Sequence, residues 1–188
     1  MSEAVSALAG ETYEGFVTVR EAGLRGMITV RGALSNVALK NAVTGVAGTD
    51  FPGQRQITYV ADQGIAWMSP DELLVMVPYA GARSATQMLA RALKGTHHLV
   101  ADVSDARTVF ALKGSGAREV LAKLSPADLS PAALQPGEIR RTRLGQVAAA
   151  FWMTGEDRFE VVTFRAQARY AMDLLSNAAR PGSEVAFF

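Results

Sequence analysis

The chain has 188 residues, a hydrophobic fraction of 49% and a formal net charge of +1, which fits one medium-sized domain or two small modules and argues against nucleic acid as the main partner. It has no cysteine, so disulfides, thiolate nucleophiles, cysteine-ligated zinc and iron–sulfur clusters are excluded. Because no basic and apolar leader opens the sequence and no apolar run approaches the ~20 residues that span a bilayer, we expect a cytoplasmic protein without membrane contact.

The first quarter of the chain changes character at about residue 26. Residues 1–25 are small, charged and weakly periodic, so we expect an N-terminal arm that is available for subunit contact. Residues 26–32 are rich in β-forming side chains and predict a strand. Ser35 is expected to cap a helix whose apolar positions begin at Val37 and continue through Val43.

The following segments complete a β-α-β-β-α-β order. Two extended runs join across the turn residues Ser69-Pro70-Asp71-Glu72, which predicts an antiparallel hairpin. An amphipathic helix that Gly95 ends and a strand then follow. The expected elements are the hairpin segments at 57–60, 65–68 and 73–77, the helix at 85–93 and the strand at 98–103.

The second half repeats this order. Trp67-Met68 recurs 85 positions later as Trp152-Met153, and residues 27–32 match residues 109–114 at a shift of 82. Three prolines make residues 125–137 an irregular insertion inside the second copy. The expected elements are strands at 108–113 and 184–188, helices at 116–124 and 167–178, and a hairpin of 147–153 with 159–164.

This repeated order is that of the ferredoxin-like split β-α-β unit. We therefore predict an α+β fold of two tandem ferredoxin-like βαββαβ modules. The first module spans residues 26–105 and the second spans residues 106–188, and we expect the two to form one compact domain behind the 1–25 arm.

A Lys113-Gly114-Ser115-Gly116 run lies between a predicted strand and a predicted helix. In a dinucleotide fingerprint such glycines let a pyrophosphate approach the helix N-terminus. Here Glu119 occupies the position of the third glycine, and its charge would repel phosphate. A tight turn with Ser115 as a cap is the favoured interpretation.

All the imidazoles of the protein lie in His97-His98. Neighbouring side chains on a strand point to opposite faces, so both cannot easily join one mononuclear metal site. An exposed or cap-bonded pair is favoured. We assign no metal ligand.

Asp102 and Asp105 flank Val103-Ser104 near the end of a predicted strand. They could act as a general base or hold a pterin ring. Turn formation through Asp105 and a helix N-cap role explain them without a ligand. We assign no catalytic or cofactor-binding residue.

Arg140, Arg141 and Arg143 form the densest positive cluster, and guanidinium groups suit carboxylates, phosphates or a folate polyglutamate tail. Alternation would place Arg141 and Arg143 on one face of a strand and Arg140 on the other. Ion pairing at an interface is favoured over catalysis. An RNA-binding sheet is a weaker alternative, because it needs exposed aromatics among basic residues.

Three segments carry a resemblance to a known family, namely residues 97–107, residues 69–74 with Val77-Pro78, and residues 141–147, and the likeness continues through 164–170 and 174–178. Together they resemble the gamma subunit of bacterial heterotetrameric sarcosine oxidase. Gamma subunits are in turn similar to the folate-binding region of glycine-cleavage aminomethyltransferases, which has two ferredoxin-like halves. That architecture agrees with the internal repeat.

The resemblance implies a complex of alpha, beta, gamma and delta subunits that oxidises sarcosine to glycine, transfers the one-carbon unit to tetrahydrofolate and releases hydrogen peroxide. It also implies that FAD, FMN, NAD, the folate site and zinc belong to the other subunits, and that this chain is a non-catalytic subunit. The alternative is a free-standing folate-binding or aminomethyltransferase-like protein, for which Asp102 or Asp105 would be the acidic residue.

Overall fold

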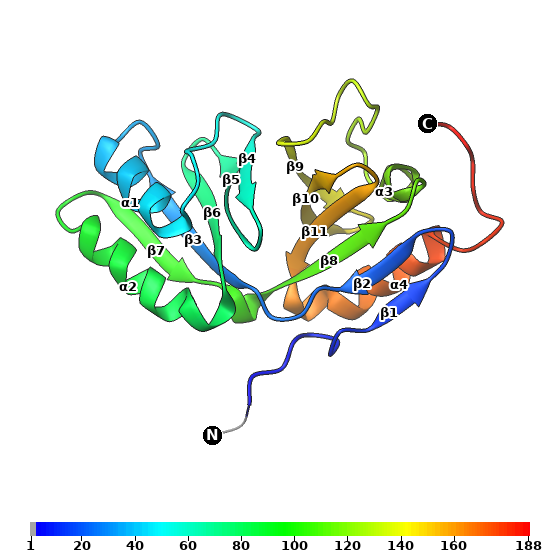
Figure 1. Cartoon of the computed structure of the whole chain (residues 1–188), viewed down its shortest axis with the longest axis horizontal. Coiled ribbons are helices and arrows are strands. Elements are labelled where there is room, and N and C mark those ends of the chain that lie inside the picture. Colours follow the sequence, from blue (N-terminus) through cyan, green and yellow to red (C-terminus); the bar gives the residue numbers. More distant parts are fainter. Residues whose placement is uncertain (1–2) are drawn as a thin grey trace. The chain divides into compact units, whose positions relative to one another are not determined.

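The computed structural model describes residues 3–188, and the chain divides into two compact units. One unit is Arg25–Asp105, and the other combines residues 3–24 with Ala106–Phe188. Each unit has one antiparallel sheet and its own helices (Figure 1). The N-terminal residues therefore group with the second half of the chain.

The unit Arg25–Asp105 has the sheet order β4-β5-β6-β3-β7. Helices α1 and α2 contact each other and strands of this sheet. Its elements are β3 (Gly26–Gly32), α1 (Val37–Ala47), β4 (Ile57–Val60), β5 (Gln63–Ser69), β6 (Glu72–Val77), the 3₁₀ turn η1 (Tyr79–Gly81), α2 (Ala82–Ala92) and β7 (His98–Asp102).

The other unit has the sheet order β1-β2-β8-β11-β10-β9. Helices α3 and α4 contact each other and its strands. Its elements are β1 (Thr12–Glu14), β2 (Thr18–Glu21), the 3₁₀ turn η2 (Ser104–Ala106) at its boundary, β8 (Arg107–Lys113), α3 (Ala117–Leu124), β9 (Ile139–Leu144), β10 (Val147–Gly155), β11 (Arg158–Phe164), the 3₁₀ turn η3 (Arg165–Gln167) and α4 (Ala168–Ala178).

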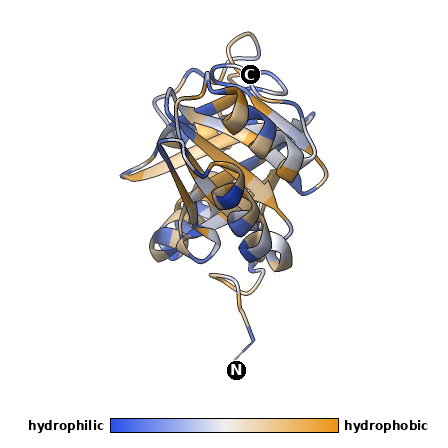
Figure 2. Cartoon of the chain, turned by 90° about the vertical axis from the view of Figure 1, so that its left-hand side faces the viewer, coloured by the Kyte–Doolittle hydropathy of each residue, from blue (hydrophilic) through white to orange (hydrophobic). Residues whose placement is uncertain are grey.

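Each sheet packs one apolar face against its two helices. Ile28, Val75 and Leu89 belong to one helix-side core, and Phe110, Val161 and Leu175 belong to the other. The strands are mainly hydrophobic in Figure 2, whereas hydrophilic positions alternate with hydrophobic ones along the helices, as amphipathic packing requires. The predicted α+β fold with two ferredoxin-like modules is confirmed by this topology and by the comparisons below.

The predicted register of the repeat is wrong by one residue over its hairpin and second helix. Trp67 packs on its helix-side core, whereas Trp152 lies between Phe151 and Met153, which both contribute to the other helix-side core. Trp67 pairs with Leu73, and Met153 pairs with Phe159. The hairpins therefore match at a shift of 86, and a slip of one residue moves a strand side chain to the opposite face.

The predicted strand at 184–188 does not form, and the N-terminal segment takes its place. In the first unit β7 pairs with β3, and in the second unit β2 pairs with β8 in the equivalent position. The structure thus differs from the predicted 1–25 arm, because residues 12–14 and 18–21 are strands of a sheet. An edge that β2 already hydrogen-bonds cannot also accept the C-terminal residues.

Polar contacts hold this N-terminal segment on its own unit. The buried carboxylate of Glu21 accepts hydrogen bonds from the Ser6 hydroxyl at 2.7 Å and from the Gly10 amide at 2.8 Å. The Phe16 amide donates to the Ala179 carbonyl at 3.0 Å. These contacts satisfy backbone groups that a free arm would leave to water.

The two predicted serine caps are also wrong. Asn36, one residue after Ser35, caps α1 by accepting a hydrogen bond from the Ala38 amide at 2.8 Å. No side chain caps α3, where Gly116 holds the N-cap position. The irregular insertion at 125–137 is confirmed, since it contains no helix or strand.

Gly15→Ala should separate the N-terminal segment from its unit. A Cβ at Gly15 would overlap the carbonyl oxygen of Ala179, which is backbone and cannot rotate away. We expect a loss of about 1–3 kcal/mol in the free energy of unfolding, the usual cost of overpacking. Gly45→Ala is the control, because Gly45 lies in α1 with open space around its Cβ position. That change should be neutral or stabilising. Equal denaturation midpoints for the two variants would contradict the assignment.

Candidate functional site

The Gly114-Ser115-Gly116 turn joins β8 to α3 and packs against the N-terminal segment. A Cβ at Gly114 would lie 3.1 Å from the Phe16 carbonyl oxygen, and one at Gly116 would overlap the Phe16 ring. Gly114 also has φ +141, a conformation that L side chains rarely adopt. Because they have no Cβ, the two glycines leave the space in which Phe16 packs against this turn.

Glu119 of α3 holds the C-terminal segment instead of repelling a phosphate. Its carboxylate accepts hydrogen bonds from the amides of Val185 at 2.7 Å and Ala186 at 2.8 Å. It also forms an ion pair with Lys123, one helical turn later, at 3.0 Å. Burial alone would raise the pKa of the Glu119 carboxyl, but these hydrogen bonds and the Lys123 charge outweigh burial and lower it.

Lys123 completes this anchor from the same helix. Its ammonium group donates to the Ser183 carbonyl at 2.6 Å and to the Ala178 carbonyl at 3.2 Å. The ammonium also lies 4.9 Å from the centroid of the Phe16 ring. Glu119 and Lys123 therefore bind the C-terminal segment, while Phe187 and Phe188 remain exposed.

His97 and His98 line an open pocket of about 550 Å³ together with Arg31 and Asp71. His97 is exposed and His98 is half-buried. The Nδ1 atom of His98 lies 3.0 Å from the Thr96 carbonyl oxygen, a local contact and not the predicted helix cap, whereas His97 is exposed as predicted. Arg31 and Asp71 form an ion pair at 3.7 Å, so the charges beside the imidazoles offset each other.

Asp102 and Asp105 both form local hydrogen bonds. Asp102 accepts from the Ser104 amide at 3.0 Å and from the Ser104 hydroxyl at 2.5 Å, so Asp102 makes the turn contact that was expected of Asp105. Ser104 in turn accepts a hydrogen bond from the Met27 amide at 3.0 Å. Asp105 accepts from the Tyr79 hydroxyl at 2.9 Å. Both carboxylates thus fix the end of β7.

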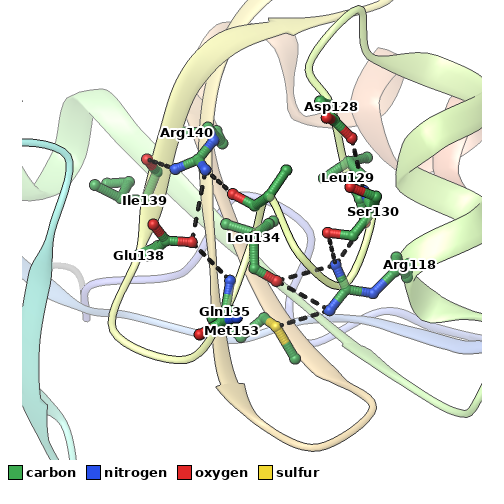
Figure 3. A network of polar contacts seen from close by, with 11 residues as sticks. Arg118, Asp128, Leu129, Ser130, Leu134, Gln135, Glu138, Ile139, Arg140 and Met153 are labelled. Atoms are coloured by element: carbon green, nitrogen blue, oxygen red, sulfur yellow. Dashed lines mark hydrogen bonds and ion pairs between the residues drawn. The ribbon is translucent and has the colours of Figure 1, made fainter.

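The arginine cluster divides between two faces of β9, as alternation predicted. Arg141 and Arg143 are exposed, whereas Arg140 is half-buried. The Arg140 guanidinium donates to the carbonyls of Ala133 and Ile139 and forms an ion pair with Glu138 at 3.6 Å (Figure 3). Arg140 therefore secures the insertion 125–137.

Arg118 of α3 is a second anchor of this insertion, and the sequence pattern gave no sign of it. Its guanidinium donates to the carbonyls of Leu129 at 2.5 Å, Ser130 at 3.3 Å and Leu134 at 3.1 Å (Figure 3). It also lies 5.5 Å from the Phe159 ring. Burial lowers the pKa of Arg118, although the Asp157 charge opposes that shift. One planar group thus satisfies three backbone acceptors.

Within residues 3–188, no three histidine or acidic side chains are arranged to hold a metal ion. The same part of the chain has no helix long and apolar enough to cross a membrane. The candidate residues singled out in the sequence lie in separate places. His98, Asp102, Glu119 and Arg140 each make local structural contacts instead of converging on one pocket.

The fold and these contacts define a two-module α+β protein whose polar residues mainly secure loops and chain ends. The model of the sarcosine oxidase, gamma subunit family matches residues 31–180. Sarcosine oxidase subunit gamma of Arthrobacter sp is 34% identical over 158 residues, which cover 83% of this chain and 76% of the relative. The subunit gamma of Corynebacterium sp. (strain P-1) is 34% identical over 161 residues, with the same coverage. The chain belongs to the sarcosine oxidase gamma subunit family.

Solved structures agree with this membership. A chain of heterotetrameric sarcosine oxidase from Corynebacterium sp. U-96, solved in complex with pyrrole 2-carboxylate, matches with a TM-score of 0.80 and 25% identity, covering 92% of this chain and 90% of that one. Glycine cleavage system aminomethyltransferase T from Bartonella henselae matches with a TM-score of 0.61 and 20% identity, covering 84% of this chain and 44% of that one. The second likeness shows a shared fold.

Glu119→Gln should release the C-terminal segment. A glutamine has one acceptor oxygen in place of two and loses the attraction to Lys123, so we expect a loss of about 1–2 kcal/mol in unfolding free energy. Carboxypeptidase should then remove residues 184–188 faster than in the wild type. Glu184→Gln is the matched control, because Glu184 is exposed in the same segment. Equal digestion rates for both variants would refute the anchor.

Acid should produce the same release in the wild type. Because the pKa of Glu119 is lowered in the folded chain, its stabilisation is present above the ordinary value of 4.5 and is lost as pH falls below it. The amide resonances of Val185 and Ala186 should report this transition. They should not change with pH in Glu119→Gln.

Arg118→Lys should loosen the insertion 125–137. An ammonium group cannot present the planar fork that reaches three carbonyls, so we expect a loss of about 2 kcal/mol measured by denaturant unfolding. Arg83→Lys is the control, since Arg83 is exposed on α2. If both variants unfold at the wild-type midpoint, the carbonyl contacts of Arg118 do not stabilise the fold.

Proposed function

We propose that this chain is the non-catalytic gamma subunit of a heterotetrameric sarcosine oxidase. The complex would convert sarcosine to glycine, pass the one-carbon unit to tetrahydrofolate and produce hydrogen peroxide. The observation that carries this proposal is the family membership over residues 31–180. It is supported by the match, over 92% of this chain, to a structure of heterotetrameric sarcosine oxidase.

In this proposal the alpha, beta and delta subunits are the partners, and these subunits hold FAD, FMN, NAD, tetrahydrofolate and zinc. The complex is cytoplasmic. The contacts of the candidate residues support such a division. Asp102 and Glu119 are both occupied by hydrogen bonds that fix backbone groups, and general base catalysis needs a carboxylate within reach of a substrate proton. The role left for this chain is to position its neighbours.

Exposed aromatic residues at two places in the second unit suit such a role. Phe164 and Tyr170 are exposed near the start of α4, and Phe187 and Phe188 are exposed beyond the Glu119 anchor. Aromatic side chains are enriched in protein interfaces relative to the rest of the surface. If the larger subunits bury these rings, apolar surface is removed from water, which favours association.

Native mass spectrometry after co-expression tests the proposal. We expect this chain in a complex with the other three subunits, and we expect sarcosine turnover by the complex and none by the chain alone. A chain that stays uncomplexed in the presence of all three companions would contradict the proposal. Turnover by the purified chain would contradict its non-catalytic role.

Titration with tetrahydrofolate separates this proposal from a free-standing folate-binding protein. The isolated chain should show no saturable binding at micromolar concentrations, whereas the assembled complex should bind. Micromolar binding by the isolated chain that Asp102→Asn abolishes would favour the alternative.

A further inference from the structure

The sheet of the second unit has two rows of side chains on the face opposite its helices. Phe110, Leu112 and Phe159 point into the helix-side core, so their strand neighbours point the other way. The registers place Glu160, Ala111 and Arg20 side by side in one row, and Arg158, Lys113 and Thr18 side by side in the next.

A hollow of about 300 Å³ lies over these two rows. Its lining includes Arg20, Ala111, Lys113, Arg158 and Glu160. Ala111 lies at the centre of one row, between the longer side chains of Arg20 and Glu160, so its single methyl group leaves space that its neighbours surround. All of these residues belong to one continuous sheet. The hollow is therefore part of a regular scaffold.

The charges around the hollow are unbalanced. Lys113 and Arg158 are directly opposite each other on paired strands, and like charges in that position are destabilising. Arg20, Lys113 and Arg158 are exposed, and within residues 3–188 none of the three has an ion-pair partner. Glu160 has an interaction of its own. The lining thus has three cations and one carboxylate, and the Glu14 carboxylate lies beside it, where it accepts a hydrogen bond from the Thr18 hydroxyl at 2.8 Å. The cations still outnumber these two carboxylates, which leaves a smaller excess of positive charge.

An acidic side chain from outside would relieve this repulsion. The sheet holds the positions of the cations, so a carboxylate placed between Lys113 and Arg158 would attract both. The cations are exposed and the hollow is open, which gives a freely diffusing ion little desolvated contact. A free anion also loses translational and rotational entropy when it binds. A carboxylate that a larger protein interface already holds in place has no such separate loss. The hollow therefore fits an acidic residue of a protein partner better than a free anion.

We infer that the hollow formed by Arg20, Lys113 and Arg158 receives an acidic segment of another subunit of the complex. This inference rests on the proposed function, because it needs a partner subunit. It adds a specific docking surface and the charge of the segment that binds there. The surface lies on strands β2, β8 and β11, away from the C-terminal anchor on α3.

The test is the assembly of the full-length chain with its companion subunits at graded NaCl concentrations. Lys113→Gln with Arg158→Gln should weaken association about tenfold at 0.1 M salt, near the range where screening sets in, and should flatten the salt dependence. The matched control is Arg83→Gln with Lys94→Gln, which removes the same charge from exposed positions of the other unit. The control should associate like the wild type.

The variants also separate folding from binding. Removing two adjacent like charges should leave the thermal midpoint unchanged or raise it, so misfolding would not account for weaker assembly. If the double variant at Lys113 and Arg158 associates as tightly as the wild type, the inference is wrong but the proposed function stands. Failure of the wild type to assemble would overturn both. Submillimolar binding of inorganic phosphate by the isolated chain, lost in the double variant, would identify a small-anion site and overturn the partner assignment.

Discussion

The structure depends on the pairing of β2 with β8, because that pairing settles which end of the chain completes the second sheet. Once Thr18–Glu21 occupies this edge, the C-terminal residues need other partners for their backbone groups. Glu119 and Lys123 supply them on the surface of α3. The glycines at 114 and 116 then make room for Phe16 as it approaches that strand. Several features that look unrelated in the sequence thus follow from one strand pairing.

This arrangement explains why residues that suggest chemistry make structural contacts. The Gly114-Ser115-Gly116 turn leaves room for Phe16 of the N-terminal segment. Glu119 accepts hydrogen bonds from two backbone amides of the C-terminal segment. Arg118 and Arg140 hold the carbonyls of the irregular insertion. A fold of this kind does not by itself determine an activity, so the role of the chain must be argued from what it contacts. The chain belongs to the sarcosine oxidase gamma subunit family, and in our proposal its role is to support the other subunits.

Local patterns predicted most helices, both hairpins and the irregular insertion, because hydrophobic periodicity and turn residues act over short distances. They failed where the outcome depends on contacts between residues that are far apart in the sequence. The Trp67 and Trp152 match suggested a shift of 85, although the core positions Leu73 and Phe159 require 86. Residues 184–188 have strand-like composition but lose the sheet edge to β2. Likewise, alternation predicted the faces of Arg140 and Arg141, whereas the carbonyl partners of Arg118 come from a loop that no periodicity describes.

Residue-resolved hydrogen exchange on the full-length chain tests most directly whether β2, and not the C-terminal segment, completes the second sheet. The amides of β2 that pair with β8 should exchange as slowly as those of the central strand β8 itself, because both belong to one cooperative sheet. Residues 187 and 188 should exchange at close to the rate of an unfolded peptide, and only the amides of Val185 and Ala186, which donate to Glu119, should show intermediate protection. Slow exchange along all of 184–188 with fast exchange along 18–21 would show that the C-terminal residues complete the sheet and would contradict this account.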